Sequence, residues 1–111
     1  MIARTWRGET RAEDADAYER YLRETGEKDC RALPGNRGVV ILRGEREGRA
    51  EFVFVSFWDG MDDVRAFAGD DPERARYYPR DYELLLTLEP FVRHHEVASA
   101  EMGMMAGAAS L

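Results

Sequence analysis

The sequence is poor in cysteine, with Cys30 as its single example in 111 residues. One cysteine excludes an intrachain disulfide, and the chain has no Cys–Cys or Cys–His spacing typical of a zinc site. No secretory segment opens the sequence, and no apolar run reaches the ~20 residues that a helix needs to cross a bilayer. We therefore expect a cytoplasmic protein that has no metal site and does not bind a membrane.

Positive charge is also scarce. The chain carries 22 acidic and 16 basic residues, which gives a net charge of −6. Such a chain repels a phosphate backbone, and no basic face interleaved with aromatic residues is present, so we expect no nucleic-acid partner. The length suits one domain with one hydrophobic core. We assign residues 1–98 to this domain and expect residues 99–111, rich in Ala, Met and Gly, to form a flexible tail.

Apolar residues are concentrated in the segment from Glu51 to Trp58. In an extended strand, successive side chains point to opposite faces. One face would carry Phe52, Phe54, Ser56 and Trp58, and the other would carry Val53, Val55 and Phe57. Both faces are apolar, so the fold has to cover both sides of this strand.

Turn and cap residues divide the rest of the chain. Thr10 and Glu13 have the spacing of a helix capping box, Gly26 is a helix stop, and Asp59 is placed to cap a second helix. A hairpin turn is expected around Gly48. The sequence predicts strands at 2–7, 39–42, 51–58 and 91–97, helices at 10–26, 59–69 and 81–88, and a helical turn beginning at 70–72.

This order, β-α-β-β-α-β, predicts an α+β protein of the ferredoxin-like class, in which a four-stranded antiparallel sheet carries both helices on one face. The helices leave the second face uncovered. Exposing three large apolar side chains there forfeits roughly 5–9 kcal/mol of burial, which rivals the ~5–15 kcal/mol by which whole domains are stable. We therefore predict a homodimer in which two sheets pack face to face as a dimeric α+β barrel.

Four stretches carry a resemblance to a known family. They are the turn Pro34-Gly35-x-x-Gly38 before the strand 39–42, the run from Phe54 to Asp59, the segment from Asp71 to Pro79, and the closing stretch from Val92 to Val97. Together with the element order, they resemble the antibiotic biosynthesis monooxygenase family of dimeric α+β barrels. The resemblance covers residues 2–98.

The resemblance implies a pocket between the sheet and its helices that is large enough for a flat aromatic molecule. It also implies a cofactor-independent monooxygenase, which deprotonates a small aromatic, phenolic or quinol compound and lets the anion react directly with dioxygen, without metal or flavin. Two alternatives remain open. One is a non-catalytic module for hydrophobic-ligand binding or assembly, and the other is an isomerase or cyclase on the same scaffold.

Candidate site residues follow from the resemblance and from residue type. His94 matches a histidine that is usual in the last strand of the family, and His95 must face the opposite way. His94 and Tyr78 are the candidate catalytic, proton-handling residues. The candidate substrate-binding residues are Trp58, Phe67, Tyr77 and Trp6. Each has a structural alternative, as an anchor in the core or as a hydrogen-bonded residue.

Arg4 shares one face of the first strand with Trp6. An arginine between apolar layers needs an acidic partner or an anionic ligand, and Glu96 is the expected partner. The haem-degrading branch of the superfamily is disfavoured, because the chain's only asparagine, Asn36, lies in a turn and neither histidine lies near the second helix.

Overall fold

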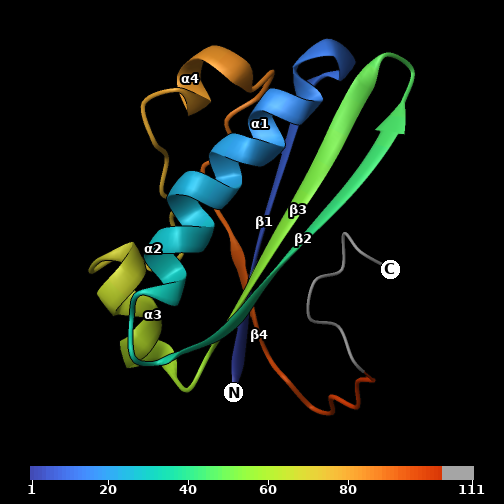
Figure 1. The fold of residues 1–111 in the computed structure, drawn as a ribbon. Helices are drawn as coiled ribbons and strands as arrows, with labels where there is room; N and C mark the ends of the chain where they lie inside the picture. Colours follow the sequence, from blue (N-terminus) through green and yellow to red (C-terminus); the bar gives the residue numbers. More distant parts are fainter. Residues whose placement is uncertain (104–111) are drawn as a thin grey trace.

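The computed structural model describes residues 1–103 as one antiparallel sheet with helices on one side. The sheet has the order β2-β3-β1-β4 (Figure 1). The predicted α+β, ferredoxin-like class is confirmed. The strands are β1 (Ile2–Arg11), β2 (Asn36–Arg46), β3 (Arg49–Trp58) and β4 (Arg93–Glu96).

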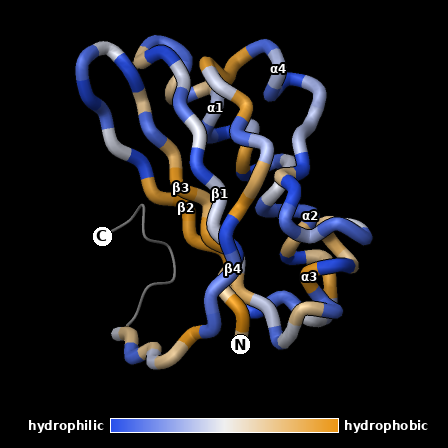
Figure 2. Tube along the Cα trace, turned by 180° about the vertical axis from the view of Figure 1, so that it is seen from behind, coloured by the Kyte–Doolittle hydropathy of each residue, from blue (hydrophilic) through white to orange (hydrophobic). Residues whose placement is uncertain are grey.

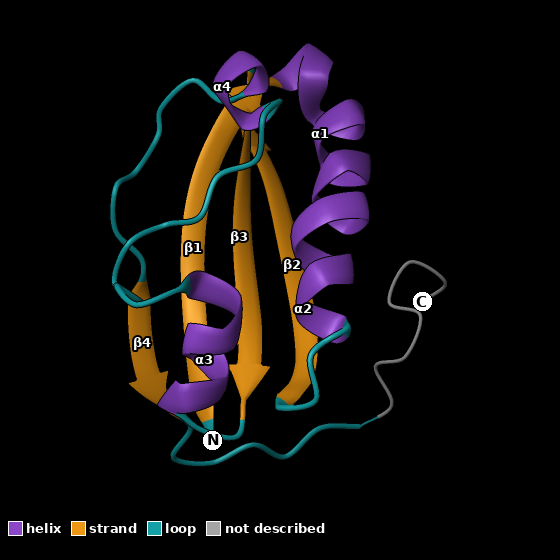
Figure 3. Ribbon diagram, turned by 90° about the vertical axis from the view of Figure 1, so that its left-hand side faces the viewer, coloured by secondary structure: helices purple, strands orange, loops and turns teal. Residues whose placement is uncertain are grey.

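The helices lie together against one face of the sheet (Figure 3). A 3₁₀ turn, η1 (Ala12–Asp14), leads into α1 (Ala15–Leu22), which continues through a π turn, η2 (Arg23–Glu27), into α2 (Lys28–Arg31). The other two helices are α3 (Met61–Ala68) and the single turn α4 (Asp81–Leu84). Side chains at helical spacing along the first of these runs are buried on the sheet: Ala15, Tyr18, Leu22 and Cys30.

The first strand is longer than predicted. Gly8 does not end it, because β1 stays paired with β3 as far as Arg11, opposite Arg49. Glycine suits this position because the Trp6 indole lies over it, where a Cβ would collide with the ring. The predicted capping box is wrong as well. Thr10 is fully buried at the end of β1, opposite Ala50 of β3, and makes no helix cap.

The first helical run does not stop at Gly26. It passes through Gly26 in the π turn and ends at Arg31. A Cβ at Gly26 would lie 3.3 Å from the Phe54 ring, so glycine here allows close packing of helix on sheet instead of ending the helix. π turns inside helices are rare and are often found at functional sites.

The hairpin between β2 and β3 has a two-residue turn. Arg46 and Arg49 are paired, and Glu47 and Gly48 between them have φ angles of 54° and 77°. Two residues with positive φ form the turn that suits the twist of a β-hairpin. The predicted hairpin is therefore present, with both strands extending further than the apolar residues alone indicated.

The segment between α3 and β4 is less helical than predicted. The expected turn at Asp71 is not a helix, and α4 ends at Leu84 instead of residue 88. Backbone hydrogen bonds join the segment to itself and to the sheet, from Ala75 N to Pro90 O and from Leu86 N to Glu9 O. These tertiary bonds satisfy the backbone groups that helical turns would have satisfied.

The helix caps also differ from expectation. Asp59 does not cap α3, whose N-cap is Gly60. The Asp59 carboxylate instead forms two hydrogen bonds of 2.7 Å with the Arg37 guanidinium. This pair ties the start of β2 to the residue that follows β3.

The two faces of β3 differ as the alternation predicted. Phe52, Ser56 and Trp58 are fully buried beneath the helices, and Phe54 is 6% exposed. The opposite face, here called the open face, carries Val53, Val55 and Phe57 of β3 and Val40 and Leu42 of β2. Figure 2 shows apolar residues along these strands, away from the polar hairpin tip. No described helix covers this face (Figures 1 and 3).

Within residues 1–103, no helix is both long and apolar enough to span a bilayer. The predicted tail at 99–111 begins inside the described part of the chain, and its last eight positions, 104–111, lie outside it.

Candidate functional site

A cleft lies between the helical face of the sheet, the α1–η2 run and the irregular segment 76–81. Its volume is about 40 Å³. A cavity that holds one benzene ring measures about 150 Å³, so this cleft has room for a few water molecules only. The lining residues are Arg4, Trp6, Tyr18, Leu22, Thr25, Gly26, Phe54, Phe67, Arg76, Tyr77, Tyr78 and Asp81.

Four of the six residues singled out in the sequence line this cleft, namely Trp6, Phe67, Tyr77 and Tyr78. Trp58 does not. It stacks behind Phe67, with ring centroids 5.9 Å apart, and its Nε1 donates a hydrogen bond of 2.9 Å to Ser56 Oγ. Trp58 therefore supports the cleft wall from the core. His94 also lies outside the lining.

Tyr78 is tied to a carboxylate across the helical layer. Its hydroxyl donates a hydrogen bond of 2.6 Å to Asp29 Oδ2, and Arg76 Nη2 lies 3.7 Å from the same oxygen. Burial, followed by the hydrogen bond to Asp29, raises the pKa of Tyr78, so the hydroxyl keeps its proton at neutral pH. Asp29 is partly exposed, so the pair connects the cleft with solvent.

A second hydroxyl–carboxylate pair lies deeper. Tyr18 donates a hydrogen bond of 2.7 Å to Asp81 Oδ1, and the Tyr78 backbone N–H donates one of 2.7 Å to Asp81 Oδ2. Asp81 is 4% exposed, and burial raises the pKa of its carboxyl group. Burial raises the pKa of Tyr18 as well, and the adjacent carboxylate adds to this rise.

Asp81, Asp29 and Arg76 are not among the site residues that the sequence predicts. Their partners lie far along the chain, 63 residues from Asp81 to Tyr18 and 49 residues from Asp29 to Tyr78. Local spacing carries no signal for such pairs. The only hint for Asp81 was an acidic residue where a helix begins, and that feature is explained equally well by the helix dipole.

Tyr77 joins a third hydrogen-bonded chain. Trp6 Nε1 donates to the Tyr77 hydroxyl at 3.1 Å, and this hydroxyl donates to the Glu89 carbonyl oxygen at 2.5 Å. The chain fixes the edges of both rings at the cleft. Because the Tyr77 proton is held by a backbone carbonyl, Tyr77 serves as wall and acceptor more readily than as a donor to a ligand.

Arg4 does not pair with Glu96, and that expectation is wrong. Glu96 lies opposite Ile2 in the β1–β4 register, two residue pairs away from the position opposite Arg4, and is exposed. Arg4 is 4% exposed, and its Nη2 donates a hydrogen bond of 2.9 Å to the Arg74 carbonyl oxygen. Its guanidinium also lies over the Phe67 ring at 5.6 Å. Burial lowers the pKa of Arg4.

His94 lies opposite Arg4 in the β1–β4 register, so the two share the helical face of the sheet, whereas His95 lies opposite Ala3 on the other face. The His94 side chain is 10% exposed, and neither ring nitrogen has a hydrogen-bond partner among the described residues. Glu73 Oε1 is 3.7 Å from Nδ1, too far for a hydrogen bond. Burial, and next Arg4, lower the pKa of His94.

We expect the stability of the protein to fall in mild acid through His94. Its pKa is lowered in the folded state, so the unfolded chain binds a proton near its ordinary value of 6.5 while the folded chain does not. The contribution of neutral His94 to stability is fully present above pH 6.5, and it is lost as the pH falls toward the lowered pKa of the folded state. The urea midpoint should therefore be lower at about pH 5 than at about pH 7.5.

The variant His94→Gln should show a smaller pH dependence of this midpoint than the wild type. His95→Gln is the matched control, because it changes the neighbouring, exposed side chain, and it should retain the wild-type dependence. The assignment of this pH dependence to His94 fails if His95→Gln flattens the dependence of the urea midpoint on pH and His94→Gln leaves it intact.

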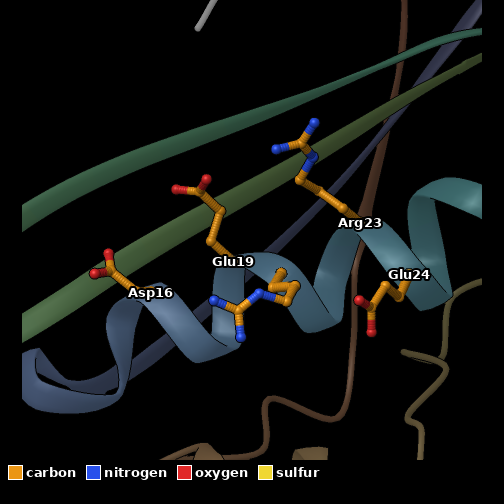
Figure 4. Close-up of a pocket in the computed structure, with 5 residues that line it drawn as sticks. Asp16, Glu19, Arg23 and Glu24 are labelled. Atoms are coloured by element: carbon orange, nitrogen blue, oxygen red, sulfur yellow. The ribbon is translucent and has the colours of Figure 1, made fainter.

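A wider hollow of about 500 Å³ lies along the outer side of α1 and η2 (Figure 4). Its lining is entirely charged: Asp16, Glu19, Arg20, Arg23 and Glu24. Asp16 and Glu19 already form ion pairs with Arg43 of β2. A solvated, mutually neutralising charged surface of this kind offers no apolar contact to a ligand.

Metal and thiol chemistry have little support in the described residues. Within 1–103, no group of three or more His, Cys, Asp or Glu side chains is arranged to hold a metal ion. Cys30 is fully buried, and burial raises the pKa of its thiol to about 12. A thiol that stays protonated is a poor nucleophile.

Comparison with known proteins agrees with this architecture. The family model described as antibiotic biosynthesis monooxygenase matches residues 1–75. Among solved structures, the chain is similar to a candidate antibiotic biosynthesis monooxygenase from Nitrosomonas europaea, with a TM-score of 0.64, 14% identity, and coverage of 89% of this chain and 100% of that chain. A second candidate, from Bacillus cereus, gives a TM-score of 0.54, 17% identity, and coverage of 93% and 95%. A search of functionally curated proteins finds no match.

Proposed function

Because the chain belongs to the antibiotic biosynthesis monooxygenase family, we propose that it is a cofactor-independent monooxygenase acting on a small aromatic, phenolic or quinol compound in the cleft. The observation that carries this proposal is the composition of the cleft. Aromatic rings form its walls, and two hydroxyl–carboxylate pairs supply proton-handling groups, Tyr78–Asp29 at its edge and Tyr18–Asp81 deeper inside.

The proposed reaction needs only dioxygen as co-substrate. Loss of the phenolic proton gives an electron-rich anion, which transfers one electron to dioxygen, and the resulting radical pair forms a carbon–oxygen bond. The hydroperoxide that results loses water to give a quinone. For each substrate molecule, one oxygen atom enters the product and the other leaves as water, while the ring carbon is oxidised and dioxygen is reduced.

Tyr78 is the residue best placed to take the phenolic proton. Its oxygen accepts a proton from the substrate as its own proton passes to Asp29, which is 2.6 Å away and partly exposed. A relay of this kind avoids a tyrosinate, which the raised pKa of Tyr78 makes unfavourable. His94 is the second candidate for proton handling and would act from behind Arg4.

Binding of an aromatic ring requires the cleft to widen. The segment from Arg76 to Tyr78 forms its outer wall and has no regular helix. This wall is held by side-chain hydrogen bonds from Arg76 to the Phe67 carbonyl and from Tyr78 to Asp29. We propose that the wall moves outward to admit substrate and closes to exclude water.

The active form in this proposal is a homodimer. The open face holds five apolar residues on adjacent strands without a helical cover, which favours a second copy of the same sheet related by a two-fold axis. We propose that residues 1–98 form this unit and that it works in the cytoplasm, where its single thiol stays reduced.

Oxygen uptake with a panel of hydroquinones and anthrones tests the function. Wild-type protein should consume dioxygen, and Tyr78→Phe should reduce the rate by about 100-fold or more, the usual contribution of one proton-transfer group. Tyr82→Phe is the matched control, because Tyr82 is 67% exposed, and it should keep the wild-type rate. A wild-type rate in Tyr78→Phe would remove Tyr78 from the mechanism.

The small volume of the cleft, about 40 Å³, favours one alternative, a non-catalytic assembly module, because the cleft in this form has no room for an aromatic ring. In that case the protein would form the same dimer but consume no dioxygen with any member of the panel. Binding of a hydroquinone without turnover would identify a ligand-binding module.

A further inference from the structure

The described residues contain three buried side-chain nitrogen atoms without a hydrogen-bond partner, and all three belong to one neighbouring pair of residues. They are Arg4 Nε and the two ring nitrogens of His94. Buried polar groups are nearly always paired, so a cluster of unpaired ones calls for a partner from outside the chain. Arg4 connects this cluster with the cleft, because it is itself a lining residue.

The carboxylates that line or border the cleft are already engaged elsewhere. Asp81 accepts hydrogen bonds from Tyr18 and Tyr78, and Asp29 accepts one from the Tyr78 hydroxyl. The charge of Glu73 acts on Arg4, but the Glu73 side chain is 63% exposed and its carboxylate approaches His94. Arg4 therefore keeps a buried positive charge with one hydrogen bond, to a neutral carbonyl oxygen.

The guanidinium of Arg76 contacts the same aromatic ring as that of Arg4. Arg76 lies over the Phe67 ring at 4.8 Å and Arg4 lies over the same ring at 5.6 Å. Both residues line the cleft. Arg76 has the Asp29 carboxylate at 3.7 Å, whereas Arg4 bonds only to a backbone carbonyl, so Arg4 is the uncompensated charge of the two. Opposite charge nearby is what a buried guanidinium requires, and a neutral ligand would not supply it.

We infer that the cleft binds its ligand as an anion, an aromatic compound whose phenolate or carboxylate oxygen lies against Arg4. The inference rests on the proposed function, which places an aromatic ligand in the cleft. What the inference adds is the negative charge of that ligand. A guanidinium donates hydrogen bonds in a planar fork that suits such an oxygen, and these charge-assisted bonds are among the stronger ones in proteins. Arg4 thereby holds the deprotonated form of the ligand.

Benzoate and benzamide provide a direct test, because they have nearly the same shape and differ in charge. Calorimetric titration of the wild-type protein should show benzoate binding about 10-fold or more tightly than benzamide, the effect expected for a hydrogen bond to a charged group. Arg4→Met should abolish this preference and Arg4→Lys should restore part of it. Arg7→Met is the matched control, since Arg7 lies on the same strand with a side chain 65% exposed, and it should keep the preference.

Thermal melting separates this role from a purely structural one. An unpaired buried charge does not stabilise the free protein, so Arg4→Met should melt no more than about 4 °C below the wild type. Equal affinity for the two probes, no binding of either, or a preference that survives Arg4→Met would overturn the inference. Oxygen uptake measured on the same preparations reports the proposed reaction independently, because an anion can bind without being oxidised.

Discussion

Replacing Val55 by aspartate is expected to convert the proposed dimer into a monomer at micromolar concentration. Val55 lies at the centre of the open face, between Val40 of β2 and Thr5 of β1. A two-fold interface repeats the substitution, so two carboxylates would be buried without partners. Each costs several kcal/mol, and the dimer dissociation constant should rise by about 100-fold or more. Sedimentation velocity measures the change.

Two further variants test whether loss of the dimer comes from a charge placed on the open face. Val55→Thr keeps the branched shape and introduces no charge, so it should weaken the dimer much less than the aspartate. Tyr82→Asp adds the same charge to α4, on the helical side of the sheet, and should leave the dimer intact. Far-UV circular dichroism should show that the aspartate variants retain their secondary structure. A dimer that survives Val55→Asp would place the interface elsewhere.

Truncation of Trp58 to alanine is expected to destabilise the protein by about 3–5 kcal/mol. Trp58 is fully buried, stacks on Phe67 and donates a hydrogen bond to Ser56. Its removal leaves a large cavity behind the cleft wall and removes the hydrogen bond that Ser56 Oγ accepts. Such a loss is a large part of the stability of an ordinary domain. Equilibrium urea unfolding measures it.

Trp58→Phe should lose distinctly less, because the ring that stacks on Phe67 remains and only the second ring and the N–H are missing. Tyr82→Ala removes an exposed ring and should change stability by about 0.5 kcal/mol at most. A change of under about 1 kcal/mol in Trp58→Ala would mean that Trp58 does not anchor the core.

The sequence predicted the sheet well because its strongest strand is apolar on both faces, and alternation then assigns each side chain to a face. The placement of Phe52 and Trp58 under the helices follows from this pattern alone. Boundary signals were less reliable. Thr10, Gly26 and Asp59 each resemble a cap in the local sequence, but strand pairing, close packing and an ion pair use them differently.

The sequence predicted which residue types line the site, but it did not predict their hydrogen-bond partners. Trp6, Phe67, Tyr77 and Tyr78 line the cleft, since aromatic residues at the junction of helices and sheet tend to meet there. The carboxylates that hold the tyrosines come from distant parts of the chain, so their positions depend on the folded geometry. The charge of Arg4 was visible in the sequence, but the absence of a carboxylate partner was not.

The most direct test of cofactor-independent oxygenation is the reaction of the chelator-treated protein with ¹⁸O₂ and a phenolic or anthrone substrate, followed by mass spectrometry of the product. We predict that one labelled oxygen atom enters each product molecule and that one dioxygen is consumed per product, without added metal or flavin. Absence of label from the product, or turnover that begins only when a metal or flavin is supplied, would contradict a cofactor-independent oxygenation in this cleft.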